Sequence, residues 1–161
     1  MLPEALSDNP LALAVSEAAP AAILDAKLAF GELTLVIDPA ELVGVCSFLK
    51  SQRGFTRLSS VTAVDFWPRK PRFEVVYHLY AIESKAWVRL KVHLAEGVEL
   101  ESVTSIWRAA NWYEREVFDL FGVVFRNHPN LERILMPSDW EGHPMRKDFP
   151  VHGYRYSYRD A

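Results

Sequence analysis

The strongest constraint on the fold is the alternation of apolar residues in two segments between positions 73 and 94, which is the clearest in the sequence. One apolar face consists of Phe73, Val75, Tyr77, Leu79 and Ala81, and a second consists of Val88, Leu90, Val92 and Leu94. A period of two residues is typical of a β-strand with one buried face. Because only residues 83–85 connect the two segments, we predict an antiparallel hairpin whose apolar side packs on a core.

Weaker alternation predicts three further strands. Residues 58–66 are expected to join the same sheet as the hairpin. Residues 26–30 and 33–37 alternate around Gly31-Glu32, which indicates a second hairpin with a glycine-first turn.

Helical spacing appears on both sides of the strands. Residues 11–19 predict a short helix, and a second helix is expected to begin at Asp38 and end at Gly54. A helix pair follows, first over 103–110 and then over 111–122, with Asn111 and Glu114 as a capping box. The order helix, two strands, helix, three strands and helix pair predicts an α+β fold, a two-layer sandwich with a mixed sheet.

Residues 126–161, hereafter the C-terminal arm, show no such periodicity. Four prolines exclude a long helix or central strand, and the aromatic residues are Trp140, Phe149, Tyr154, Tyr156 and Tyr158. Such a segment needs a surface to lie on, either its own domain or another subunit. We favour another subunit, because Tyr, Trp and Arg are common interface anchors. The chain is therefore divided into an α+β domain, 1–125, and a docking arm, 126–161, and a chain ending at Phe125 is expected to fold.

Composition limits the function further. The 161 residues fit one domain, and the net charge of −3 argues against nucleic-acid binding. Cys46 is the only cysteine, so a four-thiolate metal site and an internal disulfide are excluded. No run of about 18 apolar residues is present, and residues 1–10 contain no Lys or Arg. We therefore expect neither a membrane span nor a signal peptide. We also expect the chain to reside in a reducing compartment.

Several charged clusters have both a chemical and a structural interpretation. His128, His143 and His152 lie near acidic residues, but their spacing does not match a metal motif, so structural roles are expected. Glu114 with Glu116, or Asp119 with a histidine, has the chemistry of a general acid and base, yet acidic residues also offset the dipole in the first turn of a helix.

Basic residues occur at two further places in the same region. Arg115 is expected to form an ion pair with a neighbour. Residues 146–148, Arg-Lys-Asp, suit either an anion or a salt-bridged docking element. In the docking role, reversing the charges of both Arg146 and Lys147 is expected to weaken assembly and to leave the melting temperature almost unchanged. No dinucleotide-binding, P-loop or serine-hydrolase motif occurs.

Ordered blocks in the second half of the chain resemble one family. The blocks are EREVFDLFG at 114–122, HP at 128–129, RIL at 133–135 and EGHPMRKDFP at 141–150. They are similar to those of the 30-kDa subunit, or C subunit, of proton-pumping NADH-quinone oxidoreductase, respiratory complex I. Glu132 departs from the pattern, in which a basic residue is common at this position.

The resemblance implies a peripheral, non-redox subunit on the cytoplasmic face of a bacterial membrane. It implies contact with the 49-kDa quinone-site subunit (D) and proximity to subunits B and I, with FMN, iron-sulfur clusters and quinone held by those partner subunits and no cofactor in this chain. The expected partner-binding residues are Glu114, Arg115, Glu116, Asp119, His128, Arg133, Trp140, His143, Arg146, Lys147, Asp148 and Tyr154.

Two alternatives stay open. One is the equivalent subunit of a membrane-bound hydrogenase or a ferredoxin-type quinone oxidoreductase. The other is a small stand-alone acid–base enzyme that uses the neighbourhood of Glu114, Asp119 and His128.

Overall fold

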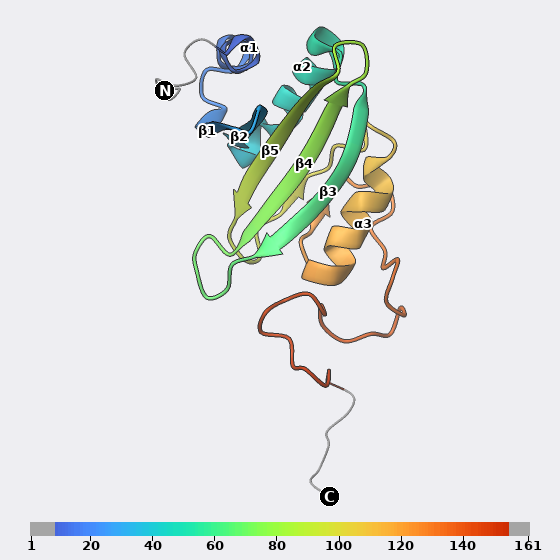
Figure 1. Cartoon of the computed structure of the whole chain (residues 1–161). Helices are drawn as coiled ribbons and strands as arrows, with labels where there is room; N and C mark the ends of the chain where they lie inside the picture. Colours follow the sequence, from blue (N-terminus) through green and yellow to red (C-terminus); the bar gives the residue numbers. More distant parts are fainter. Residues whose placement is uncertain (1–8, 155–161) are drawn as a thin grey trace, which may run out of the picture.

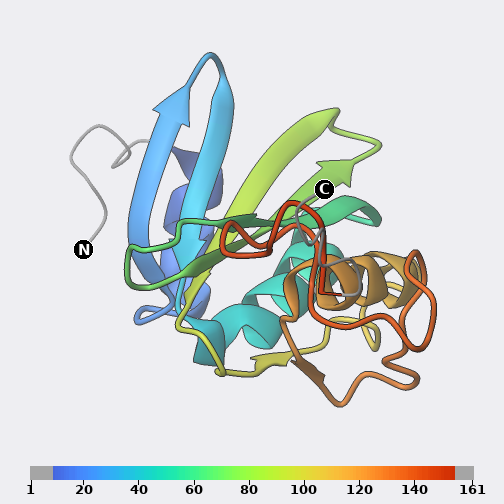
Figure 2. The same ribbon diagram turned by 90° about the horizontal axis from the view of Figure 1, so that it is seen from below.

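The computed structural model describes residues 9–154 and confirms the α+β class (Figure 1). Residues 1–8 and 155–161 lie outside the described part, and with them most of the N-terminal stretch without basic residues and two arm aromatics, Tyr156 and Tyr158. Helices α2 and α3 lie on the same face of one twisted sheet, as the view from below shows (Figure 2). None of the helices in residues 9–154 is long and apolar enough to cross a membrane.

The sheet has five strands: β1 (Ile23–Ala29), β2 (Glu32–Ile37), β3 (Arg57–Asp65), β4 (Phe73–Ala81) and β5 (Ala86–Leu94). Their spatial order is β1-β2-β5-β4-β3. The β2 and β5 strands pair in parallel and all other neighbours are antiparallel, so the sheet is mixed as predicted.

The predicted hairpin of β4 and β5 forms the centre of the sheet. Tyr77 pairs with Leu90 and Val75 with Val92, and all four side chains are buried on the helical side. The neighbouring β3 contains a bulge between Leu58 and Ser60, which shifts the register by one residue.

The N-terminal elements differ from prediction mainly at the turn between β1 and β2. Helix α1 (Pro10–Ala18) is capped by the Asn9 side chain, which accepts the N–H groups of its first turn. The β1–β2 turn consists of Phe30 and Gly31, whose φ angles are 54° and 78°. The expected turn at Gly31-Glu32 is therefore wrong by one residue, because two consecutive positive φ angles suit the twist of a tight hairpin.

Helix α2 (Leu42–Arg53) follows a 3-10 turn (Pro39–Glu41) that Asp38 caps. Gly54 ends the helix with a φ of 73°, as its position in the sequence predicted.

The predicted helix pair is a single helix, α3 (Ala110–Phe121). Residues 103–109 form turns, although Val103 and Trp107 are buried as the apolar spacing indicated. The capping box is also wrong, because the helix starts at Ala110 and has no side-chain cap, which places Asn111 inside it. Two short strands, β6 (Leu100–Glu101) and β7 (Phe125–Arg126), pair in parallel on either side of α3 in the sequence.

Candidate protein-docking site

Asp119 of helix α3 fixes the course of the C-terminal arm. One oxygen of this fully buried carboxylate accepts the backbone N–H groups of Ile134, Leu135 and Met136 at 3.0, 2.7 and 2.8 Å. The other oxygen accepts a hydrogen bond from Arg133 Nη1 at 2.7 Å. Successive N–H groups that converge on one anion provide a fixed site for negative charge. Residues 133–136 are therefore held against α3.

Two further arm side chains bond to backbone carbonyls near the same place. Arg133 also donates to the carbonyl of Gly142 at 2.9 Å, which ties two parts of the arm together. His143 Nδ1–H donates to the backbone carbonyl of Asp119 at 2.9 Å. Burial lowers the pKa of His143, so its ring is a neutral donor at pH 7.

The end of α3 receives the next arm residue, Arg146. Its Nε donates to the carbonyl of Phe121 at 2.6 Å, and its Nη1 contacts Glu96 at 3.1 Å. Gly122 ends the helix with a φ of 75°, and a Cβ built there would collide with the Arg146 guanidinium. A glycine is thus required both by the backbone and by the arm that crosses it.

A second ionic cluster holds the arm to the far end of the sheet. Arg72, only 5% exposed, donates two hydrogen bonds to Asp65 at 3.0 and 2.9 Å and one to Glu96 at 3.0 Å. The same guanidinium contacts Asp148 of the arm at 2.5 Å. The backbone N–H of Lys147 donates to Asp65 at 2.9 Å. The arm therefore completes a charge cluster that begins at the ends of β3 and β4.

The electrostatics of both sites favour the ionised forms. Burial by itself raises the pKa of Asp65, but the hydrogen bonds from Arg72 and from backbone amides outweigh it and lower the pKa to about 2. The same balance lowers the pKa of Asp119, where the amide of Met136 and the guanidinium of Arg133 oppose burial. The bond from Arg72 also lowers the pKa of Asp148. These carboxylates stay charged because donors surround them: Arg72 at Asp65 and Asp148, and arm groups at Asp119.

Glu114 lies in a separate, closed environment on α3. It is fully buried and accepts hydrogen bonds from Ser102 Oγ at 2.6 Å and the N–H of Val103 at 2.8 Å. Burial raises its pKa to about 7 in spite of these bonds. His128 lies 3.9 Å away with a buried side chain, and its Nε2–H donates to the carbonyl of Asn111. Burial lowers the pKa of His128, so Glu114 has a neutral neighbour.

The remaining predicted partner-binding residues have more exposed settings. Arg115 stacks on Trp112 and donates to the carbonyls of Glu132 and Arg133, so among the described residues it bonds to backbone rather than to the expected carboxylate. Glu116 is exposed in the middle of α3, so neither it nor Glu114 lies in the first turn, and the predicted dipole role is wrong.

The aromatic residues of the arm are divided between inside and outside. Trp140 is half-buried, and its Nε1–H has no hydrogen-bond partner within residues 9–154. Tyr154 is 58% exposed and packs edge-on against Phe149 with ring centres 5.3 Å apart.

The structure therefore brings Asp119, Arg133 and His143 together at one place and Asp148 with Lys147 at another. The polar groups of residues 133–149 bond to the chain's own domain, which is one of the two surfaces expected for the arm. Sequence reasoning missed Arg72 and Glu96. The available signal was weak: a basic residue directly before β4 and an acidic one shortly after β5.

Known proteins resemble this chain both in sequence and in structure. Residues 35–155 match the family described as respiratory-chain NADH dehydrogenase, 30 Kd subunit. The NADH-quinone oxidoreductase C subunit of Geobacter metallireducens is 46% identical over 147 residues, which cover 90% of this chain and 91% of the relative. The corresponding C subunit of Cereibacter sphaeroides is 45% identical over 155 residues, covering 95% of this chain and 76% of the relative.

A solved structure agrees with the fold. A chain of the membrane-bound sulfane sulfur reductase, an archaeal respiratory membrane complex, superposes with a TM-score of 0.76 at 28% identity, covering 88% of this chain and 84% of that one. The matched residues include the buried carboxylates of α3, Glu114 and Asp119, and the arm sequence as far as position 155. The chain belongs to the respiratory-chain NADH dehydrogenase 30 Kd subunit family.

Proposed function

We propose that the chain is a non-redox subunit of the peripheral part of NADH-quinone oxidoreductase and that its arm docks on the 49-kDa quinone-site subunit, near subunits B and I. Its position would be on the cytoplasmic face of the membrane. The relatives named as C subunits of NADH-quinone oxidoreductase support the choice of complex, and with it NADH as the donor. They favour it over a hydrogenase-type or ferredoxin-type assembly.

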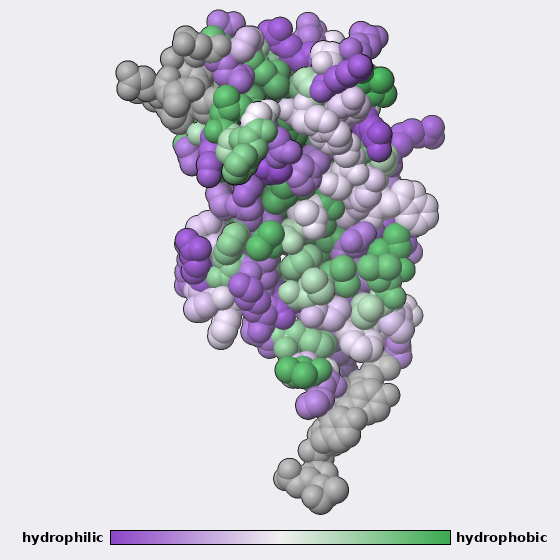
Figure 3. All heavy atoms as spheres, in the orientation of Figure 1, coloured by the Kyte–Doolittle hydropathy of each residue, from purple (hydrophilic) through white to green (hydrophobic). Residues whose placement is uncertain are grey.

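The observation that carries the docking role is the division of the arm into an inner and an outer side. Its polar groups bond inward, whereas Leu135, Met145, Val151 and Tyr154 are 56%, 56%, 95% and 58% exposed. Hydrophobic side chains gather at the surface along the course of the arm (Figure 3). A rigidly held segment with apolar side chains outside is suited to a protein interface, because little conformational entropy is lost on binding.

The chemistry of the chain supports a role without a redox centre of its own. Cys46 is buried, and burial raises the pKa of its thiol, so the thiolate needed by an iron-sulfur cluster is disfavoured. FMN, iron-sulfur clusters and quinone would then be held by partner subunits. Glu114, Asp119 and His128 have fully buried side chains, so a substrate cannot reach the residues suggested for an acid–base enzyme.

Purification of the tagged full chain from detergent-solubilised membranes tests the proposal. We expect the 49-kDa subunit to co-purify together with subunits B and I, as identified by mass spectrometry. Replacing two outer residues, L135D with M145D, should reduce the recovery of these subunits without lowering the melting temperature of the isolated chain. The matched control is I82D, because Ile82 is 59% exposed at the turn between β4 and β5, away from the arm. A chain purified alone, with turnover of its own, would refute the proposal.

A further inference from the structure

The loop between β3 and β4, residues 66–72, hereafter the basic loop, is held in one conformation at the end of the sheet. The N–H of Phe66 donates to the carbonyl of Arg72, and the N–H of Arg69 donates to the carbonyl of Phe66, both at 2.8 Å. The N–H of Trp67 donates to Asp65 at 2.9 Å. The basic loop projects beyond the strands at the lower left of Figure 1. Its exposed side chains are thus presented on a fixed backbone.

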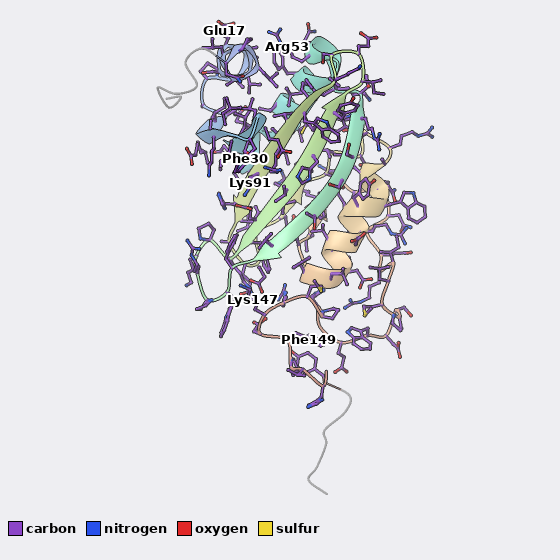
Figure 4. The ribbon with its side chains drawn as sticks, viewed as in Figure 1. Glu17, Phe30, Arg53, Lys91, Lys147 and Phe149 are labelled. Atoms are coloured by element: carbon purple, nitrogen blue, oxygen red, sulfur yellow. The ribbon has the colours of Figure 1, made fainter. Side chains whose placement is uncertain are left out.

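Those side chains are cationic in a chain of net charge −3. Arg69 and Lys70 are exposed on the basic loop, and the exposed Lys147 of the arm lies at the base of that loop, where its N–H bonds to Asp65 (Figure 4). Within residues 9–154, none of these three cations forms an ion pair. Arg69 instead stacks on the ring of Phe66 at 5.4 Å. Within the described part of the chain, these three charges are therefore left without a paired carboxylate.

The surface around the basic loop is hollowed on both sides. One hollow of about 310 Å³ is lined by Trp67, Arg72 and Glu96, among others. A second of about 210 Å³ is lined by Phe66, Glu74 and His93, among others. Arg69 and Lys70 line both hollows, so they form a ridge between them. Trp67, 48% exposed, adds an apolar surface beside the ridge.

This shape favours a protein over a membrane as the partner. A ridge between two hollows can interdigitate with side chains of another protein, whereas a flat bilayer would contact only the crest. Lipid-binding clusters also usually contain 4–8 basic residues, and this site has three exposed ones. Trp67 and Arg69 are also of the residue types that are enriched in protein–protein hot spots.

We propose that the basic loop is a second docking surface, which binds an acidic segment of a neighbouring protein subunit. Carboxylates of that segment pair with Arg69 and Lys70, and an apolar side chain packs on Trp67. This surface is distinct from the outer side of the arm. The inference rests on the proposed function in one respect only, because the partner would be another subunit of the same complex.

The test compares two charge-reversal variants of the full chain in the purified complex. R69E with K70E removes the ridge cations, and K27E with R57E makes the same change in net charge at exposed positions on β1 and at the start of β3. We expect R69E/K70E to bind the neighbouring subunit at least about tenfold more weakly when binding is measured in a salt titration. The control should bind as the wild type does. Both isolated chains should keep the wild-type melting temperature.

Zero-length carbodiimide cross-linking identifies the partner, because it joins an amine directly to a carboxylate. In the wild-type complex we expect Lys70 to be joined to an Asp or Glu of one neighbouring subunit. Equal binding of R69E/K70E, or cross-links of Lys70 within this chain only, would overturn the inference. Sedimentation of the isolated chain with phosphatidylglycerol vesicles, lost in R69E/K70E, would also overturn it in favour of lipid. A wild-type chain that does not co-purify with the complex refutes the proposed function instead.

Discussion

Replacing Asp119 by alanine should destabilise the chain more than a typical point substitution. The change removes the acceptor of three backbone N–H groups and of the Arg133 guanidinium. A buried charge left without its partner costs about 3–5 kcal/mol, and each unsatisfied amide costs about 1–3 kcal/mol. The terms do not add, because residues 134–136 can move outward and bond to water. We therefore expect a loss of about 3–5 kcal/mol for D119A.

Urea denaturation of the full chain measures this loss, and Tm should fall by about 2–4 °C for each kcal/mol. The control is E116A on the same helix, where the side chain is exposed and a change within about 0.5 kcal/mol is expected. Hydrogen exchange should accelerate at residues 134–136 but not in β5. R133Q should cost less in the D119A background than in the wild type, because the bond between the two side chains is already lost there. A D119A loss below about 1 kcal/mol, or simple additivity, would refute the reasoning.

Three other outcomes follow from the same contacts. Folded Glu114 has a pKa of about 7 and keeps a proton that the unfolded chain releases near 4.5. In urea titrations, the unfolding free energy of the wild type relative to E114Q should therefore fall by roughly 3 kcal/mol as the pH rises from about 4.5 to about 7. G122A should lower Tm more than G54A, because both positions have positive φ but only a Cβ at Gly122 meets arm side chains. R146E should lower stability by about 1–3 kcal/mol in urea, and K147E should leave it unchanged, because of these two side chains only that of Arg146 forms hydrogen bonds within residues 9–154.

The last of these outcomes revises an expectation drawn from the sequence. From residue types alone, Arg146 and Lys147 form one basic pair, and reversing both charges should weaken assembly with Tm almost unchanged. The structure separates them, since the Arg146 side chain is half-buried against the end of α3 and the Lys147 side chain is exposed. Neighbours in an irregular segment can have opposite roles because no fixed period relates position to burial.

The regular part of the fold could be predicted because its signals are local. Alternation over 73–94 identifies both the strands and their buried side, and Gly54 and Gly122 identify helix ends. The failure at 103–110 has a physical cause. There the chain is held in turns by distant partners: Glu114 accepts the N–H of Val103, and Trp107 Nε1–H donates to the carbonyl of Phe55. Apolar residues at helical spacing can be buried by such turns as well as by a helix.

The candidate site was only partly predictable, for a related reason. Asp119 and Arg133 stand in the blocks that resemble the family, so their importance was visible without their geometry. Arg72 was not visible, because its three carboxylate partners lie 7, 24 and 76 positions away in the sequence. A cluster assembled from a loop, a strand end and the arm has no spacing that a single sequence reveals.

The two sides of the arm also separate folding from recognition. Asp119, Arg133 and His143 belong to the blocks that resemble the family, yet they bond within the chain, and Asp119 has no exposed surface to offer a partner. Exposed neighbours such as Leu135 and Met145 do have such a surface, and it is placed by the inner bonds. Substitutions at inner positions should therefore change stability and assembly together, whereas those at outer positions should change assembly alone. Measuring both quantities for each variant distinguishes a residue that shapes the arm from one that contacts a partner.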